Sequence, residues 1–278
     1  MNAYQFSGGT AVVTGAASGI GASLAALLAE RGSHLVLVDR DKERLDSVAE
    51  QVRRQHPRLA VDTYVVDLSD DAATAEAAEA LAAAHPRTTL LINNAGVALG
   101  GRFDQVTLEE FDWVMAVNFR SVVRLTHAFL PALKANPGSH LVNVSSVFGI
   151  FAPAGQAAYA ASKFAVRGFS EAVRHELAEN GVGVTVVHPG GIKTRIAETA
   201  RTGSGVSAEE YEQGRKQFVK LLRMPPEAAA AQIVAAIEKR RPRLLIGASA
   251  KIPDVLVRLM PGSYWKLIAG RAGRPAAR

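Results

Sequence analysis

The stretch Thr14-Gly-Ala-Ala-Ser-Gly-Ile-Gly21 connects a predicted strand to a predicted helix. Residues 10–14 form a short apolar run, and leucines recur at helical spacing over residues 20–31. Glycines at such a junction let the backbone turn tightly and approach a pyrophosphate, and the helix N-terminus adds N–H donors and partial positive charge. A glycine triplet alone is also compatible with a simple tight turn, so its interpretation depends on the residues that follow.

A carboxylate follows at the end of the next predicted strand. Asp39 closes residues 34–39 and lies 18 residues after Gly21, where it can accept both ribose hydroxyls of NAD. The same carboxylate would repel the additional phosphate of NADP. Arg40 could pair with that phosphate, stack on adenine, or lie on the surface. We therefore expect a dinucleotide cofactor, with NAD favoured and NADP as the alternative.

Short runs of Val, Ile and Leu recur along the whole chain. They are apolar on both faces, which is typical of strands buried in a parallel sheet. The runs cover residues 10–14, 34–39, 60–66, 89–93, 140–145, 183–188 and 243–246, and helical patterns cover residues 20–31, 41–55, 70–85, 108–135 and 157–180. This alternation predicts an α/β fold, a doubly wound Rossmann-type parallel sheet of about seven strands with helices on both faces.

The length of 278 residues and the lack of a low-complexity linker indicate one domain. We expect residues 1–247 to form it, with residues 192–223 as a lid over the substrate. Residues 248–278 would be a basic, partly amphipathic C-terminal extension of the same domain. Among the basic residues of the lid are Arg195, Arg201, Arg215 and Lys216, which either face solvent or form a handle for an anionic substrate.

The net charge of +6 is concentrated at the C-terminal end. Residues 239–278 contain ten Lys or Arg and one acid, a net +9, and the other residues sum to −3. A nucleic-acid-binding body is therefore not expected. Apolar residues at helical spacing follow the last strand, namely Ile252, Val255, Leu256 and Leu259, with Tyr264, Trp265, Leu267 and Ile268 beyond them. This segment could pack on the body or a partner subunit, cover the substrate entrance, or touch a membrane surface.

Several classes of protein are excluded by composition. The chain has no cysteine, which removes disulfides, iron–sulfur clusters and a thiol nucleophile. Its seven histidines have no ligand spacing, so we expect no metal site. No apolar stretch is long enough for a transmembrane helix, and no signal segment begins the chain. We expect a cytoplasmic protein.

A tyrosine and a lysine lie four residues apart in a predicted helix. Tyr159 and Lys163 therefore project from the same face. A nearby ammonium favours the phenolate, which makes this pair a sensible general acid and base. Ser146 precedes Tyr159 by 13 residues, at the end of a predicted strand, where its hydroxyl could bind a substrate oxygen.

Together these motifs resemble the short-chain dehydrogenase/reductase family, in its common single-domain type. The resemblance is carried by residues 14–21 and 93–96, Asn118, Ser146, Tyr159-Ala-Ala-Ser-Lys163 and Pro189-Gly190. It implies a catalytic tetrad of Asn118, Ser146, Tyr159 and Lys163. Tyr159 would exchange a proton with the substrate oxygen, Ser146 would bind that oxygen, Lys163 would hold the nicotinamide ribose, and Asn118 would support a water-linked proton relay.

The cofactor site is expected to combine residues from the ends of several strands. Asp67 could instead be an N-cap or turn residue, and Asn93 could have a purely structural role. The predicted cofactor contacts are Gly15, Ser18, Gly19, Ile20, Gly21, Asp39, Arg40, Asp67, Leu68, Asn94, Ala95, Gly96, Tyr159, Lys163, Pro189, Gly190, Ile192 and Thr194.

The residues after Ser146 are apolar, and they predict a hydrophobic secondary alcohol or ketone as substrate. We expect Ser146, Phe148, Phe151 and Gly191 to line the substrate pocket, although the two phenylalanines could also be core. One alternative function is an NADPH-dependent carbonyl reductase. Another is a catalytically idle dinucleotide-binding protein, against which the complete tetrad argues. The resemblance also implies a homodimer or homotetramer.

Overall fold

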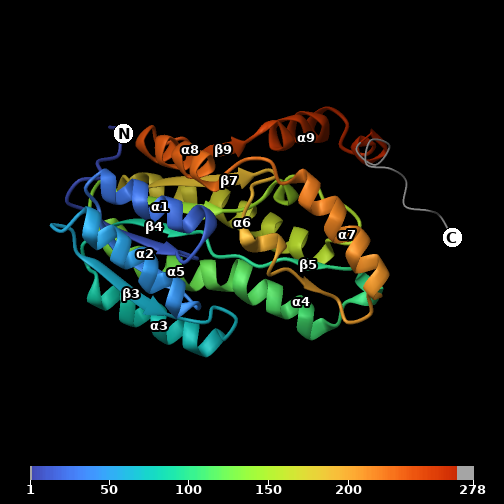
Figure 1. Ribbon diagram of the computed structural model, residues 1–278. Helices are drawn as coiled ribbons and strands as arrows, with labels where there is room; N and C mark the ends of the chain where they lie inside the picture. The colour runs from blue at the N-terminus through green and yellow to red at the C-terminus, as the bar shows by residue number, and fades with distance from the viewer. Residues whose placement is uncertain (1, 268–278) are drawn as a thin grey trace.

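The computed structural model describes residues 2–267 and is built around a seven-stranded parallel sheet (Figure 1). The strand order is β3-β2-β1-β4-β6-β7-β9. The strands are β1 (Thr10–Thr14), β2 (His34–Asp39), β3 (Val61–Val65), β4 (Thr88–Asn93), β6 (His140–Val144), β7 (Gly183–Pro189) and β9 (Arg243–Ile246). The predicted doubly wound sheet is confirmed, and each strand lies within one or two residues of the run that predicted it.

Helices cover both faces of this sheet. One face carries α1 (Gly19–Glu30), α2 (Lys42–Gln55) and α8 (Pro226–Glu238), and the other carries α3 (Asp71–Ala84), α5 (Ser121–Ala135) and α6 (Ala157–Leu177). Successive residues of a strand point to opposite faces, so Val13 packs with the first group of helices and Val12 with the second. The sheet is therefore buried on both sides, which explains why its strands are apolar throughout.

The predicted long helix over residues 108–135 is interrupted in the structure. Helix α4 (Leu108–Met115) is followed by a π-helical segment (Ala116–Arg120), and α5 continues from Ser121. Thr107 begins α4 in a capping box with Glu110. A π turn inserts an extra residue into the helix and is common at functional sites; here it contains Asn118.

Two short elements outside the main sheet were not predicted. Strand β5 (Leu99–Gly100) pairs in parallel with β8 (Arg201–Thr202), which belongs to the expected lid segment. The same segment contains a 3-10 helix (Arg195–Ala197) and α7 (Ala208–Leu221), whose start is capped by Ser207 and Glu210. This pairing fixes residues 201–202 against the body of the molecule (Figure 1).

The C-terminal extension begins with α9 (Ala248–Leu259), which follows β9 after Gly247 at φ +84°. Its inward side carries Asp254, which is buried and pairs with Arg243 and Arg258. Of the four residues of the predicted apolar stripe, Ile252, Val255 and Leu259 are exposed on the outward side, and Leu256 is half-buried. Ile268 and the rest of residues 268–278 lie outside the described part of the chain. Within residues 2–267, no helix is long and apolar enough to cross a membrane.

Candidate active site

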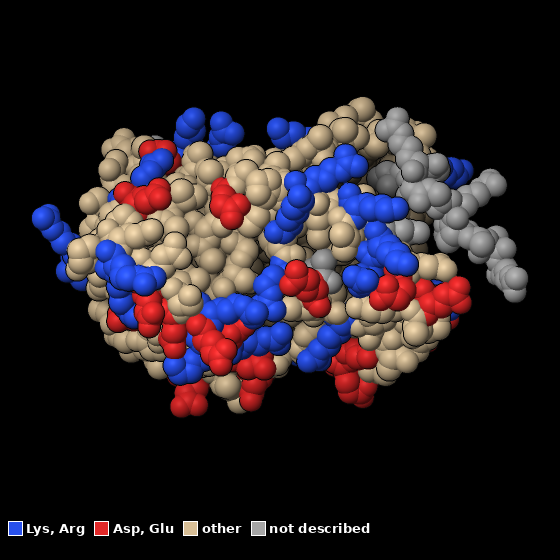
Figure 2. Space-filling model, in the orientation of Figure 1, with Lys and Arg blue, Asp and Glu red and all other residues tan. Residues whose placement is uncertain are grey.

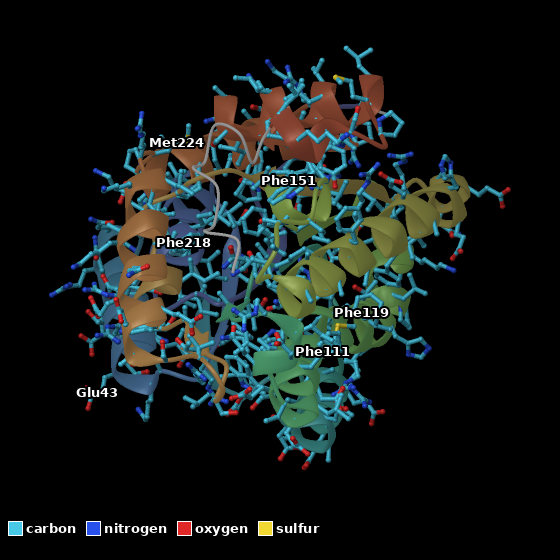
Figure 3. The ribbon with its side chains drawn as sticks, turned by 90° about the vertical axis from the view of Figure 1, so that its right-hand side faces the viewer. Glu43, Phe111, Phe119, Phe151, Phe218 and Met224 are labelled. Carbon is cyan, nitrogen blue, oxygen red and sulfur yellow. The ribbon has the colours of Figure 1, made fainter. Side chains whose placement is uncertain are left out.

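A cavity of about 630 Å³ opens at the carboxyl ends of the strands. From β1 the chain proceeds outward through β2 and β3, and then returns to β4 on the other side of β1. Ligands of doubly wound sheets bind at such a reversal of strand order. In Figure 3, Phe151 and Phe218 project toward this region from two sides, and both line the cavity.

Nearly all the residues predicted for the site lie on this cavity. The exceptions are Gly21 and Asn118, which lie behind its wall. The lining residues among those predicted are Gly15, Ser18, Gly19, Ile20, Asp39, Arg40, Asp67, Leu68, Asn94, Ala95, Gly96, Ser146, Phe148, Phe151, Tyr159, Lys163, Pro189, Gly190, Gly191, Ile192 and Thr194.

The glycine turn leaves room for a ligand and directs donors toward it. Gly15 has φ +67°, and a Cβ added there would lie 2.9 Å from the Ala95 Cα. A Cβ at Gly21 would lie 2.0 Å from the Gly15 carbonyl oxygen, so this glycine is needed for packing. No side chain caps the N-terminus of α1. Its first amides thus have no side-chain acceptor, as an approaching phosphate requires.

Asp39 is held at the rim of the cavity by two main-chain donors. Its Oδ2 accepts from the Ala17 amide at 3.0 Å and its Oδ1 accepts from the Asp41 amide at 3.0 Å. The carboxylate is thus fixed beside the glycine turn. Arg40 is exposed and lines the same end of the cavity.

Asp67 lies on the cavity and is also a turn residue. Its Oδ1 accepts from the Ser69 amide at 2.9 Å and from the Ser69 hydroxyl at 2.8 Å. Partial burial acts to raise the pKa of this carboxyl, but the bonds from Ser69 and the nearby Arg40 and Arg201 outweigh it and lower the pKa. The functional and the structural interpretation of Asp67 therefore do not exclude each other.

The two asparagines that end β4 connect strands. The Asn94 side chain donates to the carbonyl of Thr14 at 2.9 Å and to that of Gly15 at 3.3 Å, which holds the glycine turn in place. Asn93 donates to Asn143 at 2.8 Å and does not line the cavity. Of the two, Asn93 has the purely structural position.

Tyr159 and Lys163 meet at the wall of the cavity. The Lys163 Nζ lies 5.7 Å from the centroid of the Tyr159 ring and donates to the Val144 carbonyl at 3.1 Å. Burial lowers the pKa of the Lys163 ammonium to about 8. Burial also raises the pKa of the Tyr159 phenol, against which the Ser146 hydroxyl acts to lower it. Desolvation disfavours both the Lys163 ammonium and the Tyr159 phenolate, and so opposes the phenolate expected from the sequence.

Ser146 is held by one contact to its hydroxyl and one to its main-chain carbonyl. Its hydroxyl accepts from the Phe148 amide at 3.1 Å, and its carbonyl lies 3.0 Å from the Nδ1 of His188. Burial lowers the pKa of His188 to about 4, so this ring is neutral and positions Ser146 without titrating near pH 7. Ser145, its neighbour, donates to the Lys163 carbonyl at 2.8 Å and thereby holds α6 in place.

Asn118 is completely buried behind the cavity wall. Its Nδ2 donates to the Val97 carbonyl and to the Ser162 hydroxyl, both at 3.0 Å, and its Oδ1 accepts from the Val97 amide at 2.8 Å. The side chain therefore ties the π segment to the loop after β4 and to α6. Three members of the predicted tetrad face the cavity, and the fourth supports its wall.

The substrate end of the cavity is apolar. Phe148 stacks edge-on against Phe151 and Tyr159, at centroid distances of 5.3 and 6.0 Å. Of the four lid residues named as a candidate handle for an anionic substrate, only Arg195 lines the cavity. The guanidinium of Arg201 lies 3.9 Å from the centroid of the Trp113 ring, and Arg215 pairs with Glu212.

Several cavity residues were not singled out from the sequence. They come from the lid and from the C-terminal extension: Ile196, Thr199, Phe218, Leu221, Leu222 and Ser249. Trp265, one of the apolar residues that the sequence places in the extension, also lines the cavity. The Ser249 hydroxyl accepts from the Gly191 amide at 3.2 Å, so the extension supports the loop after β7. The sequence could have indicated Ser249 as a site residue, because it follows the carboxyl end of β9 and ligands bind at that edge of the sheet.

Within residues 2–267, no group of three or more His, Asp or Glu side chains could hold a metal ion.

The sequence matches the family model for short chain dehydrogenases over residues 9–205. SadH of Mycobacterium tuberculosis is 40% identical over 269 residues, which cover 95% of each chain. Dehydrogenase/reductase SDR family member 7B of Xenopus laevis is 34% identical over 94% of this chain and 81% of its own.

Solved structures similar to this chain belong to the same family as these relatives. A short-chain dehydrogenase/reductase from Burkholderia phymatum in complex with NAD superimposes with a TM-score of 0.82, at 27% identity, over 99% of this chain and 100% of its own. A metagenomic short-chain oxidoreductase in complex with NADP gives a TM-score of 0.69 at 31% identity, over 86% and 97%.

Proposed function

Because the chain belongs to the short-chain dehydrogenase/reductase family of oxidoreductases, we propose that it transfers a hydride between NAD and a hydrophobic secondary alcohol or ketone. The observation that carries the proposal is the position of Tyr159, Lys163 and Ser146 on the same cavity as the glycine turn. The apolar wall formed by Phe148 and Phe151 supports a hydrophobic substrate.

The roles of the side chains follow from their placement. Ser146 and Tyr159 hold the substrate oxygen by hydrogen bonds, and Tyr159 takes its proton during oxidation or returns it during reduction. The bound nicotinamide accepts or supplies the hydride. Lys163 lies where it can hold the ribose and, when charged, favour the phenolate of Tyr159. The side-chain amide of Asn118 is already bonded to Val97 and Ser162, so a proton relay there would use its main-chain carbonyl.

NAD is proposed over NADP because of the fixed charge of Asp39. Its carboxylate is held next to the glycine turn by two amides, where a second phosphate on the ribose would be repelled. The second candidate function is an NADPH-dependent carbonyl reductase. It is favoured by Arg40 and Arg195, which line the same cavity and could pair with that phosphate.

We also propose that residues 192–223 act as the substrate lid. Support comes from α7, because Phe218 and Leu221 line the cavity from this helix. A homodimer or homotetramer is proposed by resemblance, and light scattering would measure it.

The test is a panel of secondary alcohols and ketones, followed by nicotinamide absorbance with NAD(H) and NADP(H). We expect Tyr159→Phe to lower kcat by at least about 10²-fold, the usual contribution of a general acid or base. Tyr64→Phe is the control, because Tyr64 bonds to His85 outside the cavity. Full activity of Tyr159→Phe would contradict the mechanism. Cofactor binding without turnover of any substrate would favour an idle dinucleotide-binding protein.

A further inference from the structure

The outward face of α9 is apolar and exposed. Ile252, Val255 and Leu259 are spaced i, i+3 and i+7, so they lie on one side of the helix. Their exposed fractions are 53%, 53% and 75%. The turn that follows adds three more exposed apolar side chains: Met260, Trp265 and Leu267. Single exposed apolar residues are normal on a protein surface, but several of them on one short segment are typical of an interaction site.

The exposed charged side chains of residues 248–267 are all basic. Lys251, Arg258 and Lys266 are exposed beside it. The single acid of residues 248–267, Asp254, is buried on the opposite side and paired with Arg243 and Arg258. Figure 2 shows where basic and acidic side chains lie on one face of the molecule. The face therefore combines apolar area with the positive charges of Lys251 and Lys266, whereas Arg258 is paired with Asp254.

The face also reaches the mouth of the cavity. Trp265 lines the cavity and is 37% exposed, and Ser249 lines it from the first turn of α9. Figure 3 shows α9 above the opening, with Phe151 below it. An apolar compound held at this face would thus be adjacent to the apolar end of the cavity.

We propose that α9 and residues 260–267 dock on the surface of an anionic phospholipid bilayer, with the cavity mouth at that surface. Helices that lie in a membrane interface combine an apolar face with Lys, Arg and interfacial aromatics, and anionic headgroups attract such cations. A second copy of this chain is a poorer partner, because a twofold interface brings the same positive side chains together. Uptake of an apolar substrate from the bilayer is a corollary that rests on the proposed function; the docking does not.

The experiment is co-sedimentation of the full chain with vesicles, without substrate or cofactor. We expect binding to vesicles of phosphatidylglycerol and phosphatidylcholine and none to phosphatidylcholine alone. Raising the salt from 0.05 to about 0.5 M should weaken binding about tenfold or more, because exposed charges are screened. Val255→Asp should weaken it by a similar factor or more, since it places an acid within the apolar face.

Val65→Asp is the matched control. Val65 lies on β3 and is 52% exposed, against 53% for Val255, so the two substitutions have similar costs in the fold. Circular dichroism and cofactor binding confirm that both variants are folded. Failure of the unmodified protein to bind anionic vesicles would overturn the proposal, and so would equal binding of Val255→Asp and Val65→Asp. Dissociation of an oligomer by Val255→Asp, without any vesicle binding, would identify the face as a contact between copies and also overturn it.

Discussion

Replacement of Lys163 by methionine should remove activity and stabilise the fold near neutral pH. Lys163 is 3% exposed as a residue. Its ammonium donates a hydrogen bond to the Val144 carbonyl. Its pKa is lowered from 10.5 to about 8 by burial. The site therefore disfavours the charge that the proposed chemistry uses, and methionine fills a similar volume without it.

The magnitude follows from the pKa. Each unit corresponds to 1.36 kcal/mol, so a charged Lys163 costs about 3 kcal/mol in the folded state. Loss of its hydrogen bond to Val144 lowers the stability of the variant by about 1 kcal/mol. The variant should be more stable than the parent by about 2 kcal/mol at pH 7.

The sign of the pH dependence is fixed by proton uptake. Between pH 8 and 10.5 the unfolded chain binds the Lys163 proton more strongly than the folded chain, so the stability of the parent rises with pH. The advantage of the variant is complete below about pH 8 and disappears as the pH approaches 10.5.

Urea unfolding at pH 7 and pH 9.5 measures both effects, with turnover assayed in parallel. Lys216→Met is the control, because Lys216 is exposed on α7 and its replacement should change stability by less than about 0.5 kcal/mol. A Lys163→Met protein that is less stable than the parent by the same amount at both pH values would refute the reasoning. It would show that the buried ammonium is stabilised by its surroundings.

Three other substitutions test separate parts of the site. Asp39→Asn removes the charge that would repel the additional phosphate, so the preference for NAD over NADP in kcat/KM should fall about tenfold or more; an unchanged ratio would remove Asp39 as the determinant. Ser249→Ala deprives the Gly191 amide of its acceptor, which should raise the KM for the cofactor about fivefold with little change in kcat, and an unaltered KM would contradict this role. Asp254→Ala leaves Arg243 unpaired in a partly buried site and should cost about 3 kcal/mol in urea unfolding. Glu212 is its control, since it belongs to an exposed ion pair and Glu212→Ala should leave the stability nearly unchanged. Equal effects of the two substitutions would mean that Asp254 does not anchor α9.

The sequence predicted the elements of the site that depend on local spacing. The junction of β1 and α1 was visible because glycines and an apolar run are adjacent in the chain. Tyr159 and Lys163 were predicted to share a helical face, and they meet on the cavity wall. Alternating strands and helices predicted the sheet, because strands buried on both faces must be apolar throughout.

Other features could not be predicted, since they arise from contacts between distant segments. The π segment around Asn118 has no signature in the hydrophobic pattern of residues 108–135, and its asparagine bonds to the loop after β4. Strand β8 forms because residues 201–202 reach β5, about a hundred residues earlier. Ser249 contacts Gly191 across 58 residues of chain.

The C-terminal extension shows most directly which features the sequence determines and which depend on the tertiary structure. The sequence alone predicted helical spacing of apolar residues from Ile252 to Leu259 and placed the surplus positive charge in residues 239–278. Only the tertiary structure decided which side of that helix faces the body. The Arg243 guanidinium on β9 pairs with the buried Asp254, and Ala250 is buried on the same side of the helix. Ile252, Val255 and Leu259 therefore remain exposed. Periodicity defines a helical face, but the partner that buries it is supplied by a distant part of the chain.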